Sequence, residues 1–309
     1  MAMLNKRETL TQNITYMAIM AGVNAIFSLI AALVPVASLF LMIVLPLSSA
    51  IVFLFCRHRY YPIYAIATIV LCLLVTLFDM SFTIFYVVPS IITGYIFGLF
   101  IKLRLHAVWI ILFASVAQSL FSALSIPLVN VLFEVNLIDT FKNFLNLSSS
   151  PHVDLIIPTF LFFLSLAQIV FSYVVVYNEI GKFGYTINDQ PINILTMSLI
   201  IVGVLALIIP SVFLLPSGGY LLLAISFYFM FFVIITHIIN KNYKTLIAIG
   251  VFLVGFLFLF ALLYSVVPNP FGLLLCGILP LLVALVSLFN RLLLILSRKD
   301  RIKSTGKEK

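Results

Sequence analysis

This 309-residue sequence has few charged residues. Only 8% of the residues are charged, whereas 64% are hydrophobic and the mean hydropathy is +1.29. Water-soluble domains carry about a quarter of their residues as charged side chains, so the sequence excludes a soluble globular protein. The apolar runs are about twenty residues long and do not alternate, which predicts spanning helices and not the strands of a closed barrel. The predicted fold class is all-α, a polytopic transmembrane helical bundle.

The sequence also lacks the common motifs of catalysis and metal binding. It contains no Walker-type phosphate loop, no His-Glu-x-x-His zinc motif and no Gly-x-Ser-x-Gly nucleophile elbow. Its three cysteines and four histidines show no ligand spacing. His237, near the inner end of the predicted eighth span, is interpreted as one partner of a hydrogen bond between helices. We therefore expect no enzymatic activity, no metal site and no cofactor.

Hydropathy predicts ten spans, and the basic residues orient them. The spans are 11–33, 36–55, 63–78, 82–101, 108–128, 156–177, 193–212, 219–239, 246–266 and 271–296. With the N-terminus in the cytoplasm, every one of the 17 Lys and Arg residues except Lys142 falls on the inner side. We expect both termini to be cytoplasmic, the first span to remain uncleaved, and the protein to lie in the lipid bilayer of a bacterial cytoplasmic membrane. The net charge of +8 then orients helices and does not indicate nucleic-acid binding.

The polar segment 178–190, which holds Gly181 and Gly184, is predicted to separate two units. Residues 1–180 form a six-span unit, and residues 190–309 form a four-span unit with a basic cytoplasmic tail. The six-span unit includes an outer amphipathic segment at 129–154. Its apolar positions follow the helical period at Leu137, Ile138, Phe141, Phe144 and Leu145. This amphipathic helix is either an interfacial spacer or a lid over an outward-facing cavity.

Ionisable side chains are missing from the middle of every predicted span. Proton- and sodium-coupled carriers usually bury such a group on their pathway, so self-powered transport is disfavoured. Arg291, the one charge within a predicted span, lies close enough to the inner end to extend to the surface.

Uncharged polar side chains do occur at mid-membrane depth. One face of the fifth span carries Ser115, Gln118, Ser122 and Ser125, and one face of the sixth carries Ser165, Gln168 and Ser172. Two interpretations are open. Either Gln118 and Gln168 bond to each other and hold the helices together, or they line a pocket for a small polar or amphipathic solute from outside. The pocket residues are then Gln118, Ser122, Gln168 and Ser172, and Asn24 of the first span fits either interpretation.

The first unit resembles a known family. Small residues recur at Ala18, Ala21, Gly22 and Ala25, a proline follows in the outer turn, and the second helix bears LPLSSA at 45–50. This pattern and the six-span count resemble the substrate-capture S-components of energy-coupling-factor vitamin transporters. The resemblance implies that the small residues form a partner-helix surface for a membrane coupling subunit, that separate chains are the ATPases, and that solute binds from outside. The full length and ten-span layout are more similar to the YybS-like bacterial multi-pass membrane proteins, which implies no particular activity.

The leading hypothesis is therefore a solute-binding or transport-associated integral membrane protein, energised if at all by partner chains. The alternative is a non-catalytic membrane scaffold or regulatory protein, whose polar stripes only hold helices together.

Overall fold

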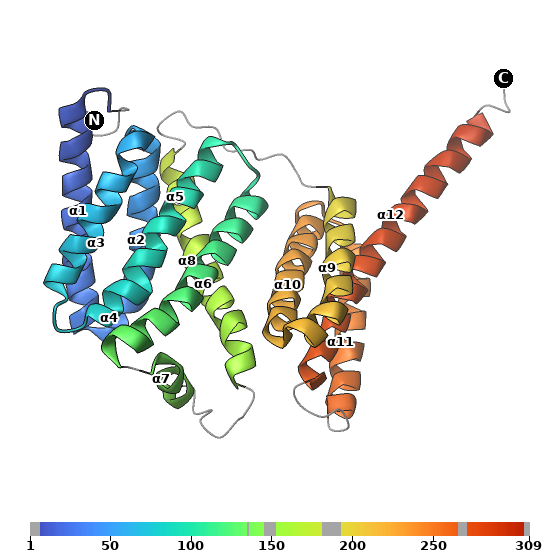
Figure 1. Cartoon of the computed structure of the whole chain (residues 1–309). Coiled ribbons are helices and arrows are strands. Elements are labelled where there is room, and N and C mark those ends of the chain that lie inside the picture. The colour runs from blue at the N-terminus through green and yellow to red at the C-terminus, as the bar shows by residue number, and fades with distance from the viewer. Residues whose placement is uncertain (1–6, 135, 145–152, 181–192, 265–270, 306–309) are drawn as a thin grey trace. The chain divides into compact units, whose positions relative to one another are not determined.

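The computed structural model describes residues 7–134, 136–144, 153–180, 193–264 and 271–305, and every element in these ranges is helical (Figure 1). The contacts between Cα atoms divide the chain into two compact units. The first comprises residues 1–153 and 160–189, and the second comprises 154–159 and 190–309.

The first unit contains the helices α1 to α7 and, from Phe160 onward, most of α8. Their bounds are α1 (Leu10–Leu33), α2 (Pro35–Phe55), α3 (Tyr61–Val75), α4 (Met80–Phe82), α5 (Val88–Lys102), α6 (Ala107–Phe133), α7 (Leu137–Phe144) and α8 (Val153–Ile180). A π-helical turn at Thr83–Val87 joins α4 to α5, and the Val88 amide donates to the Thr83 carbonyl. Pro89, the second residue of α5, follows this turn after Val88 and has no amide hydrogen to continue the α-helical ladder.

The second unit contains four long helices. They are α9 (Ile194–Leu214), α10 (Pro216–Ile239), α11 (Tyr243–Tyr264) and α12 (Ile278–Thr305), with a 3-10 segment at Phe271–Gly277 before α12. Pro216 occupies the first turn of α10, where the missing amide hydrogen has no intrahelical partner to lose.

The predicted all-α polytopic bundle is confirmed. Nine helical runs among the described residues are long and apolar enough to cross a membrane. The predicted span 36–55 coincides with α2, whose described apolar part is Val44–Phe55. The chain is a multi-pass helical membrane protein.

The amphipathic segment begins later than the sequence predicts. α6 continues to Phe133, so residues 129–133 belong to it, and Glu134 ends that helix in the left-handed conformation. The amphipathic helix itself is α7, where Asp139 is exposed and Leu137 and Ile138 are half-buried. Residues 145–152, including Leu145, lie outside the described residues.

Helix α5 packs closely against α2 through two glycines. A Cβ atom on Gly94 would lie 2.3 Å from Ser49 Cβ and 2.8 Å from the Pro46 carbonyl oxygen. A Cβ atom on Gly98 would lie 2.8 Å from the Phe53 ring. The two backbones therefore approach as closely as small residues permit.

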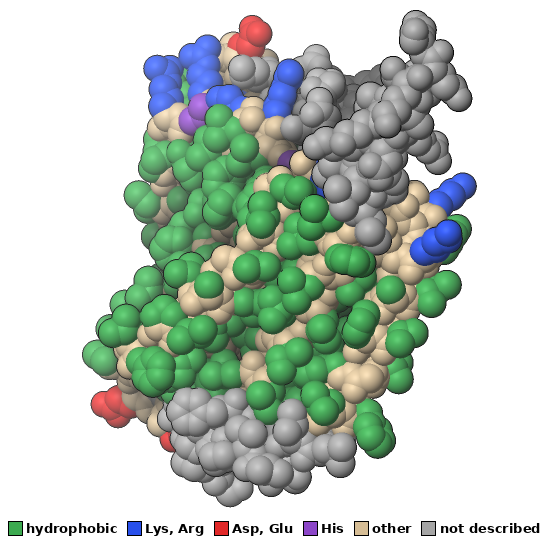
Figure 2. All heavy atoms as spheres, turned by 90° about the vertical axis from the view of Figure 1, so that its right-hand side faces the viewer, with side chains coloured by type: hydrophobic (Ala, Val, Ile, Leu, Met, Phe, Trp, Pro, Cys, Tyr) green, Lys and Arg blue, Asp and Glu red, His purple; other side chains and the backbone are tan. Residues whose placement is uncertain are grey.

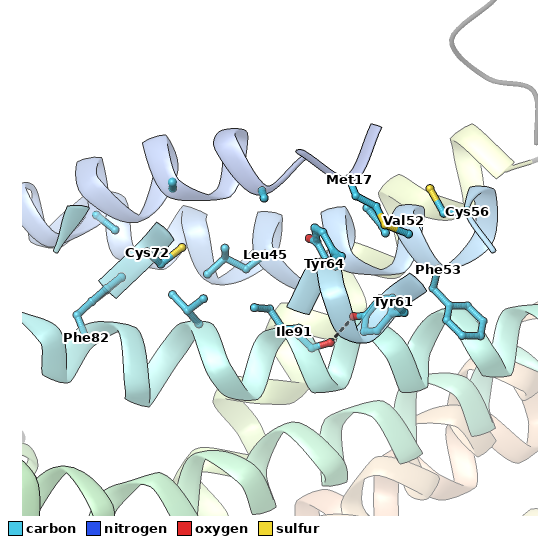
Figure 3. Packing of buried hydrophobic residues seen from close by; sticks show 14 residues of the cluster. Met17, Leu45, Val52, Phe53, Cys56, Tyr61, Tyr64, Cys72, Phe82 and Ile91 are labelled. Atoms are coloured by element: carbon cyan, nitrogen blue, oxygen red, sulfur yellow. Dashed lines mark hydrogen bonds between the residues drawn. The ribbon is translucent and has the colours of Figure 1, made fainter. Parts of the chain in front are cut away.

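Helix α3 reaches the same packing layer through aromatic side chains. The Tyr61 hydroxyl donates to the Ile91 carbonyl of α5 at 2.6 Å (Figure 3). Tyr61 and Tyr64 lie beside Phe53 and Leu45 of α2 in one buried cluster, as Figure 3 shows.

One end of the first unit, here called the basic end, is where α1 begins and where α2 and α5 end. The Arg7 amide donates to the Phe55 carbonyl at 2.9 Å, which joins the start of α1 to the end of α2. The Lys102 ammonium contacts the His58 ring nitrogen, which joins the end of α5 to the α2–α3 loop.

The outward faces of the helices are apolar. On α11, Ile247, Val251, Val254 and Phe258 are each at least two-thirds exposed, at helical spacing. Figure 2 shows hydrophobic side chains over most of the drawn face, with Lys and Arg gathered toward its upper part. Such faces are stable in contact with lipid hydrocarbon, so the bilayer is the partner that the described surface fits.

Replacing Gly94 with alanine is expected to destabilise the first unit by about 1–3 kcal/mol, because the new methyl group overlaps the α2 backbone. Gly22→Ala is the matched control, since nothing lies within 4 Å of a Cβ at that position. Thermal unfolding in mild detergent measures both variants. An unchanged midpoint for Gly94→Ala would contradict the close packing of α2 and α5.

Candidate functional site

A fully paired polar network joins the first three helices. Asn24 of α1 donates to the Tyr64 hydroxyl of α3 at 2.8 Å and accepts from the Ser48 hydroxyl of α2 at 2.7 Å. Ser49 lies 3.3 Å from the same Tyr64 hydroxyl. All four side chains are buried. Asn24, one of the predicted solute ligands, therefore has both ends of its amide occupied within the protein.

The polar side chains on one face of α6 are less completely paired than the Asn24 network. The Gln118 amide nitrogen donates to Ser90 Oγ of α5 at 3.3 Å, while its carbonyl oxygen has no partner among the described residues. Gln168 of α8 is also buried, and its carbonyl oxygen likewise lacks a partner there. The hydrogen bond between Gln118 and Gln168, one of the two interpretations of the polar stripes, is not formed, because the Gln118 amide donates to Ser90 of α5 and neither carbonyl oxygen has a described partner.

Two hydroxyl groups lie one turn from the Ser90–Gln118 pair. α5 and α6 are antiparallel, so three residues toward the basic end lead from Ser90 to Thr93 and from Gln118 to Ser115 (Figure 1). Thr93 and Ser115 thus occupy the same level, about 4.5 Å from the first pair. Both side chains are fully buried, and neither hydroxyl has a hydrogen-bond partner among the described residues.

Gln168 lies on the part of α8 that faces α5. α8 runs parallel to α5 (Figure 1), and the ring of Tyr173 lies 6.4 Å from that of Phe97. Gln168 precedes Tyr173 by five residues and Thr93 precedes Phe97 by four, so the ring contact brings the part of α8 that carries Gln168 toward the part of α5 that carries Thr93. We call Thr93, Ser115, Gln118 and Gln168 the unpaired polar layer.

The free-energy cost of this layer is substantial. A buried polar group without a partner costs about 1–3 kcal/mol, and this layer holds four such oxygen atoms. Natural structures leave few buried groups unpaired, and those few call for an explanation such as a bound molecule. Ser122 and Ser172, the other predicted pocket residues, are buried on the same helices. Thr93 and Ser90 were missed by the sequence interpretation, although their spacing of three residues repeats that of Ser115 and Gln118.

The four small residues of α1 divide into two pairs. Ala21 and Ala25 are buried inside the first unit. Ala18 is exposed, and Gly22 faces open space. Ala18 also lines a cavity of about 110 Å³ between α1 and α3. Of the predicted partner-helix surface, the outward pair is therefore Ala18 and Gly22.

Two polar contacts join helices of the second unit. His237 Nε2 of α10 lies 3.0 Å from Ser287 Oγ of α12, and that hydroxyl donates its one hydrogen to the Val283 carbonyl. Nε2 is therefore the donor, and the predicted inter-helix bond of His237 is confirmed. Arg291 of α12 donates to Asn193, the N-cap of α9. Its side chain therefore reaches the end of a neighbouring helix and does not stay in the middle of the span, as the sequence predicts.

Other chemistry in the second unit is sparse. An open cleft of about 370 Å³ between α9 and α12 is lined only by apolar residues and glycine, so it offers no group to orient a polar solute. Among the described residues of the whole chain, no three His, Cys, Asp or Glu side chains come together as metal ligands would. Burial raises the pKa of Cys56, just beyond the end of α2, to about 11, so this thiol is protonated at neutral pH.

No protein-family model matches the sequence, and neither the curated proteins nor the solved structures compared with it show a significant likeness.

Apolar replacement of Asn24 is expected to lower the stability of the protein, whereas apolar replacement of Gln118 is not. Asn24→Leu preserves the side-chain shape but removes two hydrogen bonds, and we expect it to cost about 1–3 kcal/mol. Gln118→Met removes one long hydrogen bond and an unpaired oxygen, so its unfolding midpoint should stay unchanged or rise. Thermal unfolding in detergent without added solute compares them. If Gln118→Met lowers the unfolding midpoint more than Asn24→Leu does, the Gln118 carbonyl oxygen is hydrogen-bonded within the protein.

Proposed function

We propose that this chain is a solute-binding or transport-associated membrane protein that holds a small polar molecule at the unpaired polar layer. The observation that carries the proposal is a set of four buried oxygen atoms that have no hydrogen-bond partner among the described residues: Thr93 Oγ1, Ser115 Oγ, Gln118 Oε1 and Gln168 Oε1. They lie on α5, α6 and α8 of the first unit. A bound molecule that donates hydrogen bonds to them removes the cost of leaving them unpaired.

The residue types indicate the chemistry of the solute. Amide carbonyl oxygens only accept hydrogen bonds, and hydroxyls donate or accept. None of the four residues ionises, so nothing in the layer compensates a charge on the solute. The layer therefore favours an uncharged molecule with several hydroxyl, amine or amide donors.

The proposal places the protein in a bacterial cytoplasmic membrane with both termini inside, as the distribution of basic residues supports. It assigns no catalytic reaction to the chain. Energy for any transport comes from partner chains, a membrane coupling subunit and ATPases, as the resemblance of the first six spans to S-components implies. The outward pair Ala18 and Gly22 supports this assignment, because a partner helix can approach closely there.

A second candidate function is a non-catalytic scaffold or regulator. The paired network of Asn24, Ser48 and Tyr64 favours it, because this network serves only to join α1, α2 and α3. A scaffold requires no unpaired polar groups, so apolar replacement of this layer should not impair it. The same replacement should abolish solute binding, which separates the two candidates.

The test is mass spectrometry of small molecules and proteins that co-purify from native membranes in mild detergent. We expect a stoichiometric solute with the wild type and at least tenfold less with the double variant Gln118→Met/Gln168→Met, since each lost hydrogen bond of about 1–1.5 kcal/mol weakens affinity up to tenfold. Ser226→Ala is the control, because among the described residues this buried hydroxyl donates to the Leu223 carbonyl of its own helix. Recovery of the wild type without any solute, or equal retention by the double variant, would contradict solute binding and leave the scaffold.

A further inference from the structure

Two loops meet at the basic end of the first unit, residues 56–60 between α2 and α3 and residues 102–106 between α5 and α6. A series of contacts holds them together. The Phe53 ring lies against Gly98, and the His58 ring stacks on Phe53 with centroids 4.5 Å apart and planes inclined by 19°. The Lys102 ammonium, one turn beyond Gly98, contacts His58 Nε2. The loops therefore form one surface.

This surface concentrates positive charge. Arg57, Arg59, Lys102 and Arg104 are exposed on it, and none of them forms an ion pair with a described carboxylate. In the first unit Asp79, Glu134 and Asp139 lie at the opposite end, whereas Glu8, just before α1, and Glu179, in the last turn of α8, belong to this end. The four cations therefore outnumber the two acidic residues there. Cations held together on short loops repel one another, so a bound anion lowers the free energy of the arrangement.

The backbone of Arg104 supplies an independent observation. Its φ angle is 54°, the left-handed conformation in which helices usually place glycine. The Arg104 amide donates to the Ile101 carbonyl and the Leu105 amide to the Phe100 carbonyl, which is a Schellman termination of α5. A non-glycine residue in this conformation costs about 1–2 kcal/mol, whereas a cation near a helix C-terminus gains only about 0.3–1 kcal/mol. Helix termination alone therefore favours glycine over arginine here.

Apolar side chains border the cations. Leu103, between Lys102 and Arg104, is 58% exposed, and Ile63 in the first turn of α3 is 61% exposed. A ligand that fits this surface combines an anionic group with hydrocarbon. One guanidinium group can donate to two phosphate oxygens at once. A basic residue near an anionic leaflet contributes about 1 kcal/mol to membrane binding.

We propose that loops 56–60 and 102–106 form a binding site for the phosphate of an anionic phospholipid headgroup. Arg57, Arg59, Lys102 and Arg104 hold the phosphate, and Leu103 and Ile63 contact the acyl chains. The site is independent of the unpaired polar layer. A role in orienting helices during insertion requires only positive charge, and it predicts no preference among headgroups in the finished protein.

The experiment titrates phosphatidylglycerol, or phosphatidylcholine with the same acyl chains, into the full chain in neutral detergent and follows thermal unfolding. Phosphatidylglycerol is expected to raise the unfolding midpoint, and phosphatidylcholine is not. Arg57→Gln and Arg104→Gly should each weaken the apparent affinity for phosphatidylglycerol about fivefold. Arg104→Gly should also unfold at a higher temperature than the wild type without lipid, because glycine adopts the left-handed conformation freely.

Lys244→Gln is the matched control, since it removes one exposed charge from α11 of the second unit and should leave the affinity unchanged. Equal effects of the two lipids, or wild-type affinity in both arginine variants, would overturn the proposal. Soluble glycerol phosphate is a separate arm of the titration. If it stabilises the protein as well as phosphatidylglycerol does at the same concentration, the lipid assignment is wrong and the surface binds free phosphate.

Discussion

A polar group buried in a membrane has no water to bond with, so it must form its hydrogen bonds within the protein. The arrangement of the first unit depends on this constraint. Asn24 and Tyr64 satisfy it completely, by joining α1 to α3 across forty positions of sequence. The unpaired polar layer does not, because Thr93, Ser115 and the two glutamine oxygens are buried without a described partner. The same bundle thus contains a paired network that stabilises it and a second set of polar groups that does not.

The close approach of α2 and α5 determines where these two sets lie. Gly94 admits Ser49, whose hydroxyl lies beside Tyr64, so the paired network extends to the surface of α5. Ser90 of the same helix accepts from Gln118 in the polar stripe of α6, and Thr93 is buried one turn further along. One helix therefore supports the structural network with its glycine and the candidate site with its hydroxyls. The phospholipid surface at the end of α5 uses the second close contact, between Gly98 and Phe53.

The helices were predictable from sequence because a bilayer fixes their length and excludes charge from their interiors. Burial of Gln118 and Gln168 followed from helical spacing, which does not depend on the partner helix. Their pairing did not follow, since it depends on the rotation of each helix about its axis. Ser90 competes for Gln118 only because α5 lies beside α6. Similarly, the spacing of Ala18, Ala21, Gly22 and Ala25 could not reveal which pair faces inward, and no pattern marked Tyr64 as the partner of Asn24.

A high-resolution cryo-electron microscopy map of the protein purified from its native membrane tests the central claim most directly. Solute binding at the unpaired polar layer predicts density for a non-protein molecule larger than water, within about 3.2 Å of the carbonyl oxygens of Gln118 and Gln168. A map in which the two amides bond to each other, with protein side chains filling the space between α5, α6 and α8, would contradict it.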